Sequence, residues 1–410
     1  MGYFEIATIL IVFSAIFGYI NVRFLKLPIT IGLMVITLLV TLLILIISYF
    51  NTTILDEEVF LISQIDFKVV LLDVMLSFLL FAGALHTNFQ QLKLQRKPII
   101  AFAVFSTLIS TFLVGFFVFL LLKMFSIEIN LIYCLLFGAL ISPTDPIAVL
   151  GILKQVGAPK KLETNIVGES LFNDGIGVVV FLTIYQMAKD GGTFSLTHVA
   201  ETFLVEVGGG ICLGLVLGWG TYKLMKSIDN YEVEVIITIA AVMGGTVLAQ
   251  YFHLSAPLAM VTAGLLIGND RVRKSSMSET TELYVDKFWE LIDILLNSIL
   301  FVLIGMEILV LTFNNHFIFI GLLCIPILLC ARFLSLLLPI KLYSKKMGFS
   351  KGTNLIMTWG GLRGGISIAL ALSLTNDMHR DFFLVITYII VIFSIIVQGL
   401  TLGKLVKKLS

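Results

Sequence analysis

Charged residues are scarce in this chain of 410 residues: Asp, Glu, Lys and Arg together make up 13% of it, and 59% is hydrophobic. A soluble globular protein carries about 25% charged residues, so this composition does not fit a water-exposed surface. Many uncharged stretches reach the roughly twenty residues that a helix needs to cross a bilayer. The scarcity of charge excludes a soluble enzyme or binding domain and predicts an all-α polytopic protein embedded in a lipid bilayer.

Cysteine is also rare, and its spacing excludes several classes of site. The four cysteines all fall inside apolar stretches and form no Cys-x-x-Cys pair. We interpret them as small packing residues, not as metal ligands or disulfide partners. No nucleic-acid-binding motif and no soluble domain of useful size is present in the sequence. We therefore expect neither a cofactor nor a nucleic-acid partner.

The few cations are concentrated in every second loop. We count thirteen candidate spans, centred near residues 12, 40, 78, 110, 138, 175, 212, 242, 262, 302, 328, 364 and 393. Alternate loops are basic, as at 93–97, whereas the others hold few cations and include the acids Asp56, Glu57 and Glu58. By the positive-inside rule, this pattern puts the N-terminus outside and the C-terminus in the cytoplasm. We expect the chain in the plasma membrane of a bacterium or archaeon.

Two further stretches predict contacts around the spans. The polar connection 269–290 is expected to form a cytoplasmic loop, followed by an amphipathic helix ("LYVDKFWELI", 283–292) lying at the membrane interface. The small residues of "GGGICLGLVLGWG" (208–220) indicate a close helix contact, for which a contact between protomers is one option.

Several ionisable residues lie too deep in the predicted spans for water at the membrane surface to explain them. A charge at the bilayer centre costs at least about 2.5–3.5 kcal/mol, so such a residue usually faces a wet cavity or a partner. Acids such as Asp293 and Glu307 could still reach an interface or a neighbouring helix. The residues that cannot are Asp145, Glu169, Asp174, Arg332 and Arg363.

The sixth span carries two of these acids in the segment "GESLFNDGIG" (168–177). At 100° per residue, its polar side chains fall within an arc of about 140° on one helix face: Glu169, Ser170, Asn173 and Asp174. A polar seam between helices is the simpler interpretation. Two carboxylates without a cation nearby in the sequence favour an ion site instead.

The fifth span contains "ALISPTDPIAVLG" (139–151), whose prolines should open the helix around Asp145. Non-helical backbone at membrane depth is tolerated only where protein or a watery cavity satisfies it. A carboxylate, the Thr144 hydroxyl and loose carbonyls are the oxygen ligands that a cation such as Na⁺ prefers. The twelfth span has a second weak point in "TWGGLRGGISIAL" (358–370). Interruptions seven spans apart predict two inverted six-helix repeats, whose discontinuous fifth and twelfth helices cross at the midplane.

In these motifs the sequence resembles the NhaP/NHE-type sodium/proton antiporters of the monovalent cation:proton antiporter family. The resemblance runs over nearly the whole chain. It rests on "FLLFAGALHTNF" (78–89), "SPTDPIAV" (142–149), "GESLFNDGIGVVVF" (168–181), "LAMVTAGLLIGN" (258–269), "FWELIDILLNSILFVLIGMEI" (288–308) and "WGGLRGGISIALAL" (359–372).

The resemblance implies a division into two domains. A core ion-transport domain (98–198 and 314–410, spans 4–6 and 11–13) would move in elevator fashion against a dimerisation domain (1–97 and 199–313, spans 1–3 and 7–10). A homodimer is implied as well.

By its motifs, the resemblance also implies which residues form the ion site. Asp174 of the Asn-Asp pair would bind the cation and carry the proton, while Arg363 would hold the second broken span. Arg332 would pair with Glu169, although the resemblance leaves open which arginine does so. The implied site comprises Thr144, Asp145, Glu169, Ser170, Asn173 and Asp174. Transported Na⁺ would contact Asp145, Glu169, Ser170 and Asp174.

We therefore expect a secondary transporter that exchanges Na⁺ or Li⁺ for H⁺. The Asn-Asp pair, in place of Asp-Asp, implies electroneutral one-for-one exchange. Exchange of K⁺, or of several monovalent cations, for H⁺ remains an alternative, because selectivity depends on sub-ångström geometry. An intramembrane aspartyl protease would need a Gly-x-Gly-Asp tetrapeptide, which the sequence lacks. Inverted broken helices favour alternating access over a passive channel.

Overall fold

The computed structural model describes residues 3–48, 69–189, 196–311, 314–347 and 352–409. Every regular element within these ranges is helical. Nine helices of this part of the chain are long and apolar enough to cross a membrane, and shorter apolar helices cover Val69–Leu85, Leu131–Ile141 and Ala256–Ile267. The chain is thus an all-helical membrane protein, as its composition predicts. The predicted acidic loop at 56–58 lies outside the described residues.

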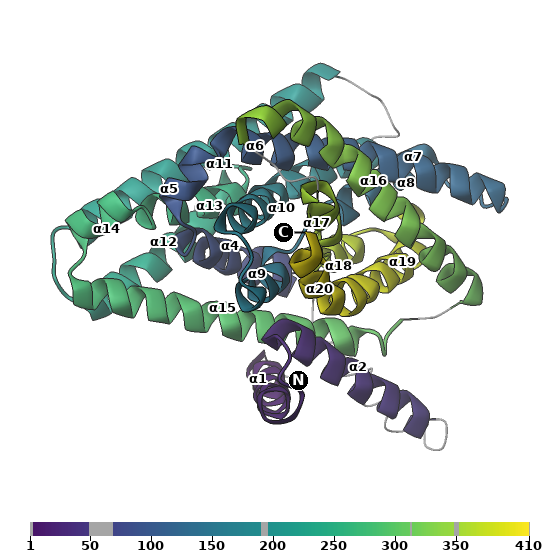
Figure 1. Ribbon diagram of the computed structural model, residues 1–410, viewed down its shortest axis with the longest axis horizontal. Helices are drawn as coiled ribbons and strands as arrows, with labels where there is room; N and C mark the ends of the chain where they lie inside the picture. Colours follow the sequence, from purple (N-terminus) through teal and green to yellow (C-terminus); the bar gives the residue numbers. More distant parts are fainter. Residues whose placement is uncertain (1–2, 49–68, 190–195, 312–313, 348–351, 410) are drawn as a thin grey trace.

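One group of helices occupies the left and the lower edge of Figure 1, where the long helix α15 runs with α1 and α2 beneath it. In this group α11 packs against α13, α13 against α4, and α15 against α1, α2, α4 and α12. Labels with η mark short π- or 3₁₀-helical turns. The members are α1 (Tyr3–Ile20), η1 (Asn21–Leu25), α2 (Ile29–Ser48), η2 (Val69–Met75), α4 (Leu76–Leu85), α11 (Leu196–Met225), α12 (Tyr231–Tyr251), α13 (Ala256–Ile267), α14 (Asp270–Ser276) and α15 (Glu279–Glu307).

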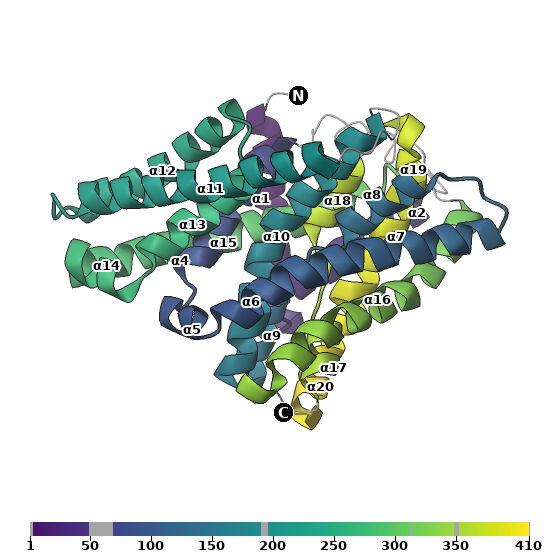
Figure 2. The ribbon, with the colours of Figure 1, turned by 90° about the horizontal axis from the view of Figure 1, so that it is seen from above.

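The second group fills the middle and right of Figure 1, and Figure 2 shows α7 and α16 on the side away from α12 and α14. Here α7 packs against α8 and α16, α16 against α19, and α10 against α8 and α9. The members are α5 (Phe89–Leu94), α6 (Arg96–Ala101), η3 (Phe102–Ser106), α7 (Thr107–Met124), α8 (Leu131–Ile141), α9 (Pro146–Val156), α10 (Lys160–Lys189), α16 (Asn315–Met347), α17 (Thr353–Trp359), α18 (Gly365–Leu372), η4 (Asn376–Met378), α19 (Arg380–Phe393), η5 (Ser394–Gln398) and α20 (Gly399–Leu409).

Two linkers interrupt helices where the sequence predicts weak points. The chain is not helical at 142–145, between α8 and α9, or at 360–364, between α17 and α18. The two prolines of the first linker cannot donate backbone hydrogen bonds and disfavour helical geometry before them, which ends α8 and starts α9. The linkers touch, because Asp145 N donates a hydrogen bond to Leu362 O at 2.8 Å. The four half-helices therefore meet at one point.

The backbone of the second linker is satisfied by side chains of η5. Ser394 Oγ accepts a hydrogen bond from Arg363 N at 2.8 Å, and Gln398 Nε2 donates to Trp359 O at 3.0 Å. Ser394 and Gln398 are buried. Since hydrocarbon offers no hydrogen bonds, these side chains allow non-helical backbone at this depth.

The segment 283–292 is helical, as predicted, but it is not a separate element. It forms the first part of α15, which continues without a break from Glu279 to Glu307. Val285 and Trp289 of this part are buried, and Trp289 Nε1 donates to Thr238 Oγ1 of α12 at 3.0 Å. Packing against α12 thus covers Trp289, whereas Leu283 and Leu291 of the same segment remain exposed.

The small residues of α11 make a close helix contact, but within the chain. A Cβ added at Gly210, Gly214 or Gly218 would meet backbone atoms of Ser255, Ala259 or Ala263. These glycines let α11 and α13 approach at van der Waals distance along their shared length. Gly210, Gly214 and Gly218 therefore face α13 and not another protomer.

Adding a methyl group to this contact should destabilise the fold. In Gly214→Ala, the new Cβ overlaps the carbonyl oxygen of Ala259, and backbone cannot move aside as a side chain can. We expect a loss of about 1–3 kcal/mol in the free energy of unfolding, the usual effect of overpacking. The measurement is thermal unfolding of the purified protein in detergent.

Gly220→Ala on the same helix is the matched control, since a Cβ there has no described atom within 4 Å. Alanine favours helix over glycine, so this variant should be at least as stable as the original chain. Equal melting temperatures for the two variants would contradict the predicted contact.

Candidate functional site

The polar face of α10 points into the protein. Glu169, Ser170, Asn173 and Asp174 are each at most 3% exposed. A buried carboxylate needs a positive partner, a hydrogen-bond donor or a proton, because burial makes the ionised form costly. The neighbours of this face therefore decide what each acid does.

Asn173 and Ser170 hold the first linker through Thr144. Thr144 N donates to Asn173 Oδ1 at 3.2 Å, and Asn173 Nδ2 donates to Thr144 Oγ1 at 2.9 Å. Thr144 Oγ1 also shares a hydrogen bond of 2.8 Å with Ser170 Oγ. These bonds satisfy backbone that the prolines leave without helical partners, and they fix the linker against α10.

Arg363 neutralises the end of α8. Its Nη1 donates to the carbonyl oxygens of Ser142 and Pro143, at 2.5 Å and 2.8 Å. The C-terminus of a helix carries a partial negative charge, so a guanidinium is favourable there. The sequence led us to expect these carbonyls to be loose cation ligands. The structure corrects this expectation, because an arginine from the second linker already binds them.

Asp145 lies where helix N-termini meet. It directly precedes α9, and its carboxylate rests against the residue before α18, since a Cβ added at Gly364 would lie 2.6 Å from Asp145 Oδ2. Helix N-termini carry partial positive charge, which favours an anion in this position. The glycine is needed here for close approach.

Glu169 is paired with Arg332 of α16. The distance from Arg332 Nη1 to Glu169 Oε1 is 2.6 Å, and both side chains are buried. Arg332 Nη1 also donates to Ser106 Oγ of η3 at 3.0 Å. Of the two deep arginines, Arg332 thus forms this pair, while Arg363 binds the carbonyls of the first linker.

A cavity of about 60 Å³ lies at the crossing of the interrupted helices, lined by Thr144, Asp145, Asp174, Asn297 and Ser367 among others. A water needs roughly 10–15 Å³ of such volume, so a few waters or a partly hydrated cation fit. Asp174 Oδ1 accepts no hydrogen bond from any described residue. The structure thus brings Thr144, Asp145 and Asp174 to one cavity, whereas Ser170 and Asn173 bind Thr144 and Glu169 binds Arg332.

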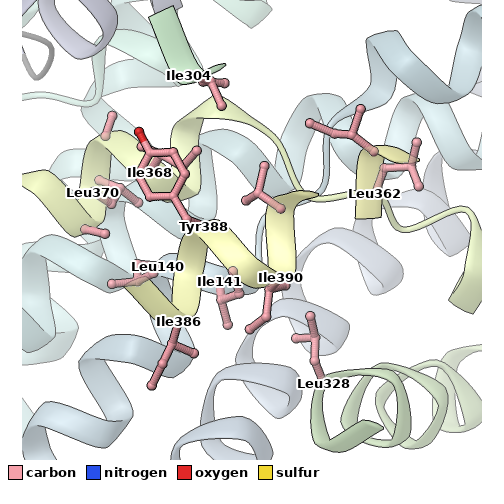
Figure 3. Packing of buried hydrophobic residues seen from close by; sticks show 14 of the residues in the cluster. Leu140, Ile141, Ile304, Leu328, Leu362, Ile368, Leu370, Ile386, Tyr388 and Ile390 are labelled. Carbon is pink, nitrogen blue, oxygen red and sulfur yellow. The ribbon is translucent and has the colours of Figure 1, made fainter. Parts of the chain in front are cut away.

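The cavity continues towards one face of the protein. A larger cavity of about 670 Å³ shares Gly83, Pro146 and Leu171 with it and is lined by Lys154 and Glu163. On the opposite side, buried side chains of α8, α18, α19 and the end of α15 pack together, and Figure 3 shows Tyr388 beside Ile368 in this cluster. The site is therefore open towards the end of α9 that carries Lys154 and closed towards the start of α8.

Several residues of the site escaped prediction from the sequence. Ser106, Ser394 and Gln398 hold Arg332 or the second linker, yet each looks like an ordinary polar residue in an apolar span. Asn297 also lines the cavity. A polar amide inside the apolar run 288–308 was the signal in the sequence that could have indicated its place at the site.

Comparison with known proteins assigns the chain to a family. The family model described as "Sodium/hydrogen exchanger, transmembrane" matches residues 11–408. The chain belongs to this family. It is 45% identical over 410 residues to the Na⁺/H⁺ antiporter NhaP of Pseudomonas aeruginosa, covering 99% of this chain and 96% of that one. It is 35% identical over 360 residues to the Na⁺/H⁺ antiporter NhaH of Halobacillus dabanensis, covering 87% of each.

The fold has a counterpart among solved structures of the family. The sodium proton antiporter MjNhaP1 from Methanocaldococcus jannaschii superimposes with a TM-score of 0.77 at 20% identity, covering 98% of this chain and 97% of that one. The predicted resemblance is confirmed: the chain is a NhaP-type, multi-pass member of a transporter family that uses no cofactor. It is not an enzyme, which rules out the aspartyl-protease alternative.

Breaking the buried ion pair of this family member should destabilise it strongly. Arg332→Gln leaves the Glu169 carboxylate buried without its cation, which we expect to lower the free energy of unfolding by about 3–5 kcal/mol. The double variant with Glu169→Gln removes both charges and should recover most of that loss. Unfolding of the protein in mixed detergent and SDS measures both.

Lys287→Gln is the control, because it removes a pair of the same 2.6 Å distance whose side chains are 64% and 51% exposed. Water screens such a pair, so we expect no measurable change. A double variant no more stable than Arg332→Gln would show that hydrogen bonds, and not the unpaired charge, dominate.

Proposed function

We propose that this protein exchanges Na⁺ or Li⁺ for H⁺ across the membrane, one for one, by alternating access at a single carboxylate site. Its family and its relatives named Na⁺/H⁺ antiporters support this activity. The observation that carries the proposal is the buried Asp174 carboxylate, which faces a small cavity together with Asp145 at the crossing of two interrupted helices.

The chemistry of the proposed site is a competition. Two carboxylates in one cavity repel each other, so a cation or a proton that neutralises Asp174 is bound favourably. Arg332 forms an ion pair with Glu169, and Arg363 binds the carbonyl oxygens of the first linker. Neither arginine therefore neutralises Asp174 by direct contact. Asp174 binds either Na⁺ or H⁺, and the neutralised site crosses between the two faces. Direct ligation of Na⁺ by Glu169 and Ser170 stays a prediction.

The proposed movement separates the two groups of helices. Residues 98–198 and 314–410 form the moving core, and residues 1–97 and 199–313 form the dimerisation domain of a homodimer. The packing described above supports this division, since most close helix contacts lie within one group. One exception is α5, which precedes the boundary at residue 98 but packs against α6 and α10. In the described part of the chain, thirteen crossings are made by the nine long helices, the shorter helices Val69–Leu85 and Ala256–Ile267, and the interrupted pairs α8/α9 and α17/α18. We propose that they are arranged as two inverted repeats.

The proposed orientation follows from the basic loops. One groove is lined by basic residues of the short helices α5, α6 and α14, namely Lys93, Arg96, Lys97 and Arg271. By the positive-inside rule, this face is cytoplasmic. Lys154 lines the cavity that leads to Asp174, so the site is open to the cytoplasm in this conformation.

Removing the carboxylate of Asp174 should abolish exchange. We expect Asp174→Ala to eliminate the Na⁺-dependent recovery of a pH-sensitive dye in everted vesicles from a strain without antiporters. Na⁺, Li⁺ and K⁺ are tested side by side, which also decides between Na⁺ and K⁺ as the substrate. Asp377→Asn removes an exposed carboxylate and should retain activity. Full activity of Asp174→Ala would refute the assignment.

Competition at one site predicts a defined pH dependence. Lowering the pH on the cation-binding side should raise the KM for Na⁺, because protons occupy Asp174, and leave the maximal rate at saturating Na⁺ unchanged. Initial rates of ²²Na⁺ uptake into proteoliposomes measure both quantities.

Electroneutral exchange also predicts the same rate with and without a membrane potential set by K⁺ and valinomycin. A rate that follows the potential would contradict one-for-one exchange.

A further inference from the structure

The side-chain amide of Asn297 in α15 donates hydrogen bonds through its nitrogen, whereas its oxygen has no hydrogen-bond partner among the described residues. Its Nδ2 donates to Asp293 O at 2.7 Å and to Asp293 Oδ1 at 3.0 Å. Its Oδ1 accepts no hydrogen bond from the described residues, although Asn297 is only 3% exposed. A buried acceptor without a donor is unfavourable, and it needs a physical reason.

The orientation of this amide is imposed by its neighbour. Both atoms of Asp293 that contact Asn297 are oxygens that accept hydrogen bonds. Turning the amide over would place Oδ1 against them and lose both bonds. Asp293 therefore holds Nδ2 on its own side and leaves Oδ1 as the free atom of the amide.

The residue that carries this oxygen lines the cavity of the ion site. Asn297 lines that cavity together with Asp145 and Asp174. It also lines a second cavity of about 360 Å³ with Asp293 and Lys26, and Asp293 lines the larger cavity that opens at Lys154. We call the face of the protein that carries Lys154 the basic face. Asp293 and Asn297 thus lie between the two wider cavities on this face and the carboxylates at the helix crossing.

We propose that Asn297 Oδ1 is a ligand of the transported cation, oriented by Asp293, and that it acts only while the site faces the basic side of the protein. An amide oxygen is a suitable ligand for a hard cation. This proposal rests on the proposed function, because it assumes that the cation binds at Asp174.

The sidedness follows from where Asn297 is attached. It lies on α15, which packs with α1, α2, α4 and α12, whereas Asp145 and Asp174 lie on or beside α9 and α10 of the other group. If the two groups move relative to each other, the contact between Asn297 and the cation is made in this conformation and broken in the other. Asn297 then contributes to cation binding from the basic face alone.

The test compares the KM for Na⁺ on the two faces of the membrane. In everted vesicles the added Na⁺ reaches the basic face, and in right-side-out vesicles it reaches the opposite face. Asn297→Ala should raise the KM at the basic face roughly tenfold or more, the size expected when a polar group loses one contact with a charge. The KM at the opposite face should change much less.

Asp293→Asn changes no volume and keeps an oxygen near Asn297, so it tests orientation if Asn297→Ala fails to fold. We expect a smaller rise in the same KM. Ser298→Ala is the matched control. Ser298 is the next buried residue of α15, its hydroxyl donates to Ile294 O at 2.7 Å, and it lines none of these cavities. It should leave both KM values unchanged.

A direct binding measurement separates ligation from later steps. Na⁺ in place of choline should raise the melting temperature of the purified protein, and Asn297→Ala should need a correspondingly higher Na⁺ concentration for the same rise. Wild-type KM and wild-type stabilisation in Asn297→Ala would overturn the proposal. An equal rise in KM on both faces would overturn its sidedness. If the unchanged chain and Ser298→Ala showed no Na⁺/H⁺ exchange, the proposed function would fail instead.

Discussion

The structure depends on one constraint: at membrane depth, backbone that leaves a helix must find its hydrogen bonds within the protein. The two interrupted helices meet this constraint largely through each other. Asp145 N donates to Leu362 O, and the Arg363 side chain binds carbonyls of the first linker. Neither linker could be buried alone, so the crossing forms as a unit, and the ion site is built around it.

Charge is distributed at this crossing according to the helix ends. Arg363 lies at the C-terminus of α8, and Asp145 lies at the N-terminus of α9, each opposite in sign to the local dipole. Glu169 and Arg332 neutralise each other. Asp174 Oδ1 has no hydrogen-bond partner among the described residues. Asp174 is therefore the acid best placed to bind Na⁺ and H⁺ in turn.

Features that depend on residues close in sequence were predicted well, and features that depend on contacts between distant residues were not. The prolines at 143 and 146 and the glycines around Arg363 located both interruptions, because their effect on the backbone is local. The polar face of α10 followed from helix periodicity alone. The extent of α15, the partner of the α11 glycines and the arginine on the first linker's carbonyls depend on contacts between distant segments, and the sequence did not predict them.

Composition and local geometry were enough to predict a helical membrane protein, the breaks in its helices and the acids that lie too deep for water. The arginine that meets Glu169, the residues that line the cavity and the contribution of α15 through Asn297 became known only from the packing of the helices. Pairing of buried charges depends on distances of a few ångströms between helices far apart along the chain. No spacing in a single sequence encodes those distances.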